Sequence, residues 1–122
     1  MDLRSILGRS GERQAERFLR KLGYRTVVRN YRCPHGEIDL VMLDGATVVF
    51  VEVKTRTGDE HADPEDAVNP GKRQRMGRAA RHFLRRTGSE HRVCRFDILA
   101  IVRRPDGSSQ FEHYIQAFTP DE

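Results

Sequence analysis

An apolar run that follows an Asp-Gly turn is the feature that most limits the possible folds of this chain. Apolar residues alternate with other residues through 37–42, Asp44-Gly45 is typical of a two-residue hairpin loop, and residues 48–53 are almost continuously apolar. Such a run is typical of a strand that is covered on both faces of its sheet. The sequence therefore predicts two antiparallel strands, the second of them central in its sheet.

The remaining sequence adds two helices and three strands to this hairpin. Apolar residues at helical spacing predict helices over residues 10–23, with Ser10 as the N-cap, and over residues 71–87. The other strand-like runs are residues 24–32, 93–103 and 111–118. The order α-β-β-β-α-β-β predicts an α/β fold, with a small mixed sheet flanked by helices, in one domain over residues 1–122.

Several classes of protein are disfavoured by the composition. The chain has no signal-peptide pattern at its start and no apolar segment of membrane-spanning length. Cys33 and Cys94 lie far apart in the sequence, and the five histidines lack zinc-ligand spacing. Residues 57–70 are acidic, carry two prolines and are predicted to form an exposed loop. We therefore expect a cytoplasmic protein with reduced thiols, no structural zinc and no membrane association.

The net charge of +4 is unevenly divided along the chain. Residues 68–104 contain eleven basic and two acidic residues, a net +9, whereas the rest contains eleven basic and sixteen acidic residues, a net −5. The second helix is nearly free of acids, so we expect it to contact nucleic-acid phosphates, with an ordinary solvated helix face as the alternative. Its candidate binding residues are Lys72, Arg73, Arg75, Arg78, Arg81 and Arg85, followed by Arg86.

Acidic side chains gather on one face of the predicted hairpin. With Asp44-Gly45 as its loop, Asp39 is predicted opposite Phe50 and Glu37 opposite Glu52. Paired and alternate positions share a face of the sheet, so the three carboxylates project together. Asp39 and Glu52 are then diagonal neighbours, about 7–8 Å apart at the backbone. We expect them to share one hard cation such as Mg²⁺, with Glu37 as a candidate additional acid.

A solvated face with cross-strand ion pairs is the alternative explanation of these charges. Glu52 and Lys54, however, interrupt the most apolar strand of the chain, where an unpaired charge is costly. Glu37 opposite Glu52 would also place like charges together unless a cation or a proton intervenes.

The first helix offers a further acid. On a helical wheel Glu12 points more nearly toward the apolar stripe than Glu16, so Glu12 is the candidate additional ligand. Its alternative role is to stabilise the N-terminal end of this helix from the first turn.

Five motifs resemble the YraN-like family of small bacterial proteins. They are Gly11-Glu12, Arg29-Asn30-Tyr31-Arg32, Gly36-Glu37-Ile38-Asp39-Leu40, Phe50-Val51-Glu52-Val53-Lys54-Thr55-Arg56 and Arg95-Phe96-Asp97. That family resembles the restriction-endonuclease-like superfamily, whose signature is written PD-(D/E)XK, and is similar in element order to archaeal Holliday-junction resolvases. Ile38 stands where the signature has its proline.

The resemblance implies a restriction-endonuclease-like fold and a role for each motif residue. Asp39 and Glu52 would bind one or two Mg²⁺ or Mn²⁺ ions, with the Val53 carbonyl as a further ligand. Lys54 would orient or activate the attacking water, and Glu12 would complete the acidic site.

The expected function is Mg²⁺-dependent hydrolysis of phosphodiesters by metal-activated water, on branched or otherwise structured DNA. A non-catalytic nucleic-acid-binding protein with the same fold is the first alternative. A second is an interaction subunit whose acidic loop and basic helix join copies into a homodimer.

Overall fold

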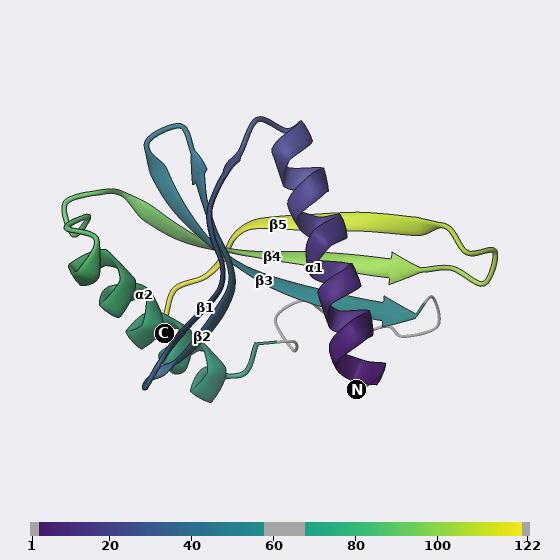
Figure 1. The fold of residues 1–122 in the computed structure, drawn as a ribbon, viewed down its shortest axis with the longest axis horizontal. Helices are drawn as coiled ribbons and strands as arrows, with labels where there is room; N and C mark the ends of the chain where they lie inside the picture. Colours follow the sequence, from purple (N-terminus) through teal and green to yellow (C-terminus); the bar gives the residue numbers. More distant parts are fainter. Residues whose placement is uncertain (1–2, 58–67, 121–122) are drawn as a thin grey trace.

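The computed structural model describes residues 3–57 and 68–120. Its order of two helices and five strands confirms the predicted α-β-β-β-α-β-β arrangement of an α/β fold (Figure 1). The elements are α1 (Leu3–Lys21), β1 (Arg25–Cys33), β2 (Gly36–Asp44), β3 (Thr47–Thr57), α2 (Pro70–Arg86), β4 (Cys94–Arg103) and β5 (Ser109–Phe118).

The five strands form one mixed sheet in the order β1-β2-β3-β4-β5. Strands β3 and β4 are parallel, because the chain crosses over through α2 between them, and the other neighbouring pairs are antiparallel. Strand β3 is the central strand, as its apolar sequence predicts.

The helices cover opposite faces of the sheet and create two cores (Figure 1). Met76 and Phe83 of α2 pack in one core with Phe50 of β3. Ala15 and Leu19 of α1 pack in the other. Successive side chains of β3 alternate between these two cores, so its middle residues are buried on both sides.

The first helix is longer than the sequence predicts. It begins at Leu3 and includes Ser10, so the prediction of Ser10 as the N-cap is wrong. The predicted end is nearly right, because Gly23 adopts a φ of +100° and the Tyr24 amide donates to the Leu19 carbonyl at 3.1 Å.

The second helix begins and ends within one residue of its predicted limits. The Asn69 side chain accepts a hydrogen bond from the Lys72 amide at 2.9 Å, and Pro70 occupies the first helical position. At the other end Thr87 caps the helix, and Gly88 follows with a φ of +65°.

The predicted loop over residues 57–70 lies largely outside the described residues. Of its described parts, Thr57 ends β3, and Val68, with no exposed surface, packs into the α2 core. Val68 therefore anchors the chain to the core just before α2 begins.

The hairpin turn lies one residue later than predicted. Asp44 pairs with Thr47, so Gly45 and Ala46 form the loop rather than Asp44 and Gly45. Gly45 has a φ of +60° and Ala46 does not have a positive φ, which is the pattern of a type II′ turn, with glycine at its first central position.

This turn corrects the predicted pairing of β2 and β3. Phe50 lies opposite Val41 rather than Asp39, and Glu37 is not opposite Glu52. The difference is two residues, and an even shift leaves every side chain on its predicted face. In the observed pairing Asp39 therefore lies nearer to Glu52 along β3 than predicted, and the two side chains remain on the same face of the sheet.

Two smaller predictions concern thiols and membranes. Both cysteines are free, with Cys33 half-buried and Cys94 exposed. Within residues 3–57 and 68–120, neither helix has the length and apolar character needed to cross a membrane.

Candidate active site

Asp39 lies where the pairing of β2 with β3 ends. Leu40 and Val51 form the last pair of this ladder. Beyond it, the Val53 amide donates to Oδ2 of Asp39 at 2.8 Å. The Asp39 carboxylate thus takes the place of a backbone acceptor and is held against β3.

Asp39, Glu52 and Glu12 form what we call the acidic cluster. Glu52 is nearly buried, with 6% of its surface exposed. It forms an ion pair with Nζ of Lys72, which reaches it from the first turn of α2. The second helix therefore supplies the positive charge beside Glu52.

The Glu52 carboxylate strongly perturbs Asp39. Burial, together with the neighbouring Glu52 carboxylate, raises the pKa of Asp39 to about 8. The Val53 amide and the Lys72 ammonium act in the opposite direction and only partly offset this shift. With no further cation bound, burial beside Glu52 therefore favours the protonated form of Asp39.

Glu12 reaches the same cluster from α1. Burial raises the pKa of Glu12, a hydrogen bond with Asn30 lowers it in part, and the Glu37 and Glu52 carboxylates raise it further. Because α1 begins at Leu3, Glu12 is not in its first turn, so the alternative role at the helix N-terminus is wrong.

Gly11 brings Glu12 close to the sheet. A Cβ on Gly11 would lie 2.6 Å from Oγ1 of Thr55, so a larger side chain would push α1 away from β3 or displace Thr55. The Gly11-Glu12 motif therefore combines a close approach with the acid that the approach delivers.

Gly11→Ala should test this approach through its coupling to Thr55. Alanine favours the helix by about 1 kcal/mol, but overlap with Oγ1 should cancel that gain. In a Thr55→Ala background the gain should reappear, which gives a coupling of about 1–2 kcal/mol in urea unfolding. Additive effects of the two substitutions would contradict the close packing of α1 on β3.

Glu16, which the helical wheel places farther outward than Glu12, is in fact the more buried acid, with 7% of its surface exposed. Its carboxylate accepts hydrogen bonds from Nε of Arg29 at 2.8 Å and from the Thr26 hydroxyl at 2.6 Å. The Arg29 contact lowers the pKa of Glu16. The prediction is wrong on burial because β1 covers Glu16, and these contacts occupy the carboxylate.

The remaining two candidates are exposed. Glu37 forms an ion pair with Arg32 at 3.2 Å and acts on the cluster through its charge on Glu12. Lys54 follows Glu52 by two residues on the same face of β3, and it forms no ion pair with any residue that the structure describes. Lys54 is therefore the cation available for a ligand, whereas Lys72 is engaged by Glu52.

The cluster is built on two carboxylates rather than on a closed ligand cage. Across the described parts of the chain, no three His, Cys, Asp or Glu side chains come close enough together to hold a metal ion. Asp39 and Glu52 form the central pair, and Glu12 contributes at longer range.

The basic residues of α2 divide into two groups. Lys72 contacts Glu52, while Arg73 donates from Nε to the Val68 carbonyl at 2.9 Å and lies over the Phe118 ring. The arginines exposed on the helix surface are Arg75, Arg78, Arg81, Arg85 and Arg86.

Asp97 is a polar site to which the sequence assigned no role of its own. It has no exposed surface and accepts hydrogen bonds from Arg95, from Nε2 of His113 and from the Gln116 amide. Burial raises the pKa of Asp97, but these donors outweigh burial and lower it. The sequence signal was an acid inside an apolar strand, and the contacts indicate that it ties β5 to β4.

Comparison with known proteins places these residues in a family context. The model of "Uncharacterised protein family UPF0102" matches residues 11–101, which include both strands of the acidic cluster. A UPF0102 protein of Symbiobacterium thermophilum is 46% identical over 101 residues, covering 83% of this chain and 86% of its own. A second, of Pelotomaculum thermopropionicum, is 40% identical over 118 residues, covering 96% and 98%. A third, of Geobacter sulfurreducens, is 42% identical over 113 residues, covering 93% and 88%.

Proposed function

Because the chain belongs to Uncharacterised protein family UPF0102, the YraN family, which is a restriction-endonuclease-like group, we propose that it is a Mg²⁺-dependent endonuclease acting on structured or branched DNA. The observation that carries this proposal is the juxtaposition of Asp39 and Glu52. A buried carboxylate beside a half-buried one, with a single lysine in contact, lacks positive charge, and a divalent cation would supply it.

The donor atoms fit Mg²⁺ or Mn²⁺. Both are hard cations that prefer carboxylate oxygen and retain several waters, so a pair of acids suffices as their protein ligands. Asp39 and Glu52 would hold the ion, and Glu12 would add negative charge from α1. When bound, the ion would polarise a phosphoryl oxygen and lower the pKa of a water.

Residues of the chain itself would perform the remaining steps. Lys54 lies on the same face of β3 as Glu52 and is exposed, so its ammonium is placed to orient the attacking water or a phosphate oxygen. The Val53 amide fixes the Asp39 carboxylate by a hydrogen bond. The exposed arginines of α2 would bind the phosphate backbone without reading bases.

A non-catalytic nucleic-acid-binding protein is the second candidate, and one observation favours it. Lys72 already supplies a positive charge to Glu52, so the cluster is partly neutralised by the chain itself. In that case α2 would bind DNA, and the carboxylates would serve to anchor the helix.

Cleavage of a panel of branched, flapped and single-stranded DNAs distinguishes these candidates. We expect the purified protein to cleave at least one of them with Mg²⁺ or Mn²⁺ and none with EDTA, because the carboxylate pair needs its cation. Binding without cleavage under either metal would reject the endonuclease and support the binding protein.

A further inference from the structure

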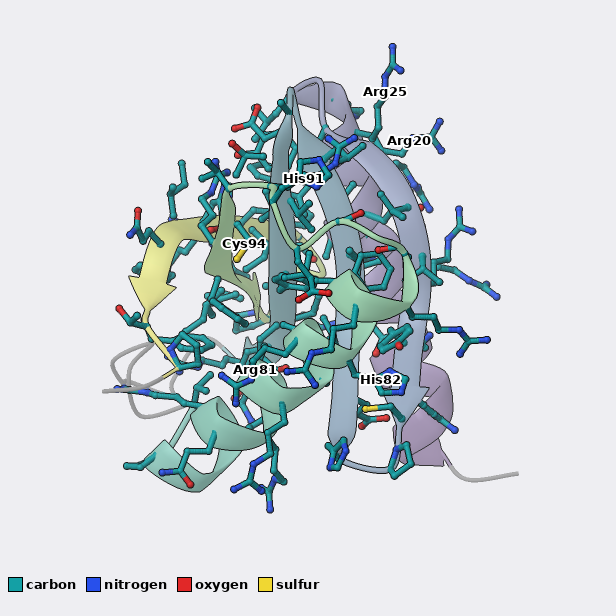
Figure 2. The ribbon with its side chains drawn as sticks, turned by 90° about the vertical axis from the view of Figure 1, so that its left-hand side faces the viewer. Arg20, Arg25, Arg81, His82, His91 and Cys94 are labelled. Carbon is teal, nitrogen blue, oxygen red and sulfur yellow. The ribbon has the colours of Figure 1, made fainter. Side chains whose placement is uncertain are left out.

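A hollow beside the C-terminal half of α2 is not used by the proposed chemistry, which involves Lys72 and Glu52 at the start of this helix. It is open to solvent and has a volume of about 600 Å³, between α2 and the turn that joins β1 to β2. The residues that line it are His35, Arg78, Arg81, His82, Arg85 and Arg86. Figure 2 labels Arg81 and His82 on α2, with His82 next to β1 and β2.

The described residues that line this hollow are rich in positive charge. Four of them are arginines, and none is acidic. Among the residues that the structure describes, Arg78, Arg85 and Arg86 have no carboxylate partner, so their guanidinium groups repel one another, and they match the oxygens of a phosphate as paired donors. An anion with several oxygens would therefore relieve the repulsion and use these donors.

The chain also fixes the orientation of one imidazole at this hollow. Nδ1 of His82 is hydrogen-bonded to the hydroxyl of Tyr31, a residue with only 9% of its surface exposed. With the hydroxyl as donor, Nε2 carries the ring proton and remains a hydrogen-bond donor for a ligand. The His35 ring packs edge-on against His82, with 6.4 Å between centroids, and brings a second imidazole from the β1–β2 turn.

The position of the hollow suggests the source of the phosphate. His82 follows Lys72, the partner of Glu52, by ten helical residues, which at 1.5 Å per residue places it about 15 Å along α2. Phosphates of one DNA strand advance by about 3.4 Å per base pair along the duplex axis. On a duplex whose axis ran along α2, the two places would be separated by about four to five base pairs.

We propose that this hollow is a phosphate-binding site and that a duplex lies along α2, so that the hollow holds its backbone about four to five base pairs from the acidic cluster. Arg78, Arg85 and Arg86 supply paired donors, and His82 supplies a donor that Tyr31 holds in place. The choice of nucleic acid as ligand rests on the proposed function, but binding at the hollow does not depend on cleavage.

The test measures DNA binding of the Arg78→Ala/Arg85→Ala variant in EDTA, where cleavage plays no part. We expect affinity for a duplex of about 30 base pairs to fall about tenfold or more at about 0.1 M salt. The slope of log affinity against log salt should fall in magnitude by about two. His82→Gln should weaken binding less, with a smaller change in that slope.

The matched control is Arg20→Ala/Arg25→Ala, which removes the same charge from exposed positions near the other end of the sheet (Figure 2). It should bind DNA nearly as well as the unaltered protein. Equal loss in both double variants would reduce the effect to net charge and overturn the proposed site.

Inorganic phosphate distinguishes the source of the ligand. Titration into the ¹⁵N-labelled protein should shift the His35 and His82 ring signals weakly, and the duplex should shift the same signals at far lower concentration. Shifts with phosphate and none with the duplex would overturn the backbone assignment and leave a small-anion site. If the proposed endonuclease activity fails while these binding results hold, the hollow stands without the cleavage.

Discussion

Glu52→Gln is expected to lower metal-dependent DNA cleavage by about 10³-fold or more in kcat/KM. The substitution keeps the size of the side chain and a hydrogen-bond acceptor for Lys72, but it removes one of the two charges that would hold the cation. Cleavage of the preferred DNA in Mn²⁺ measures the loss, and calorimetric titration with Mn²⁺ should show weakened binding of the metal.

Two variants separate this effect from general damage. Lys54→Ala should lose cleavage to a similar degree yet keep its affinity for Mn²⁺, because Lys54 is exposed and makes no ion pair with Glu52. Glu90→Gln makes the same chemical change at an exposed position after α2 and should cleave normally. Full cleavage by Glu52→Gln, with its fold intact by circular dichroism, would reject Glu52 as a metal ligand.

Asp39→Asn is expected to stabilise the metal-free protein at pH 8 by roughly 2–4 kcal/mol. The pKa of Asp39 is raised to about 8 in the folded protein, against 3.8 as its ordinary value, so the folded state holds a proton that the unfolded state releases. Stability of the unaltered protein should therefore fall as pH rises from about 4 to 8. Asparagine does not titrate, and it can still accept the hydrogen bond from the Val53 amide.

Urea unfolding in EDTA at several pH values between 4 and 8 measures this prediction. The two proteins should be nearly equal near pH 4, and their difference should widen with pH. Asp106→Asn alters an exposed turn residue and should follow the pH profile of the unaltered protein in this range. A constant difference between Asp39→Asn and the unaltered protein would contradict the raised pKa.

The architecture could be predicted from the sequence because its signals are local. Apolar runs of strand length, an apolar stripe in each helix and glycines after the helices predict the order of elements, and Gly23 and Gly88 do follow the helices with positive φ. The start of α1 could not be found in this way, because Ser10 has the side chain of a typical N-cap but lies inside a helix that begins at Leu3.

The acidic cluster was predictable for a different reason. The hairpin prediction misplaced the turn by one residue, and the resulting shift of two residues preserved the faces of Asp39 and Glu52. Because side chains alternate along a strand, a shift of two residues does not change the face on which an acid lies. A helical wheel, in contrast, contains no information about neighbouring strands, so it could not show that β1 covers Glu16. The contacts of Lys72 with Glu52 and of Asn30 with Glu12 could not be predicted either, because in each pair the two residues lie on different elements and meet only in the folded chain.

The hydrogen bond between the Val53 amide and Asp39 has a consequence for how the sheet responds to its own chemistry. Val53 stands between Glu52 and Lys54, so the backbone unit that holds Asp39 also carries the other two residues of the proposed reaction. Any change in the charge of Asp39, by proton loss or by a cation, alters the strength of that one bond. Occupation of the cluster by a proton or a cation therefore changes a bond made by the peptide group that lies between Glu52 and Lys54.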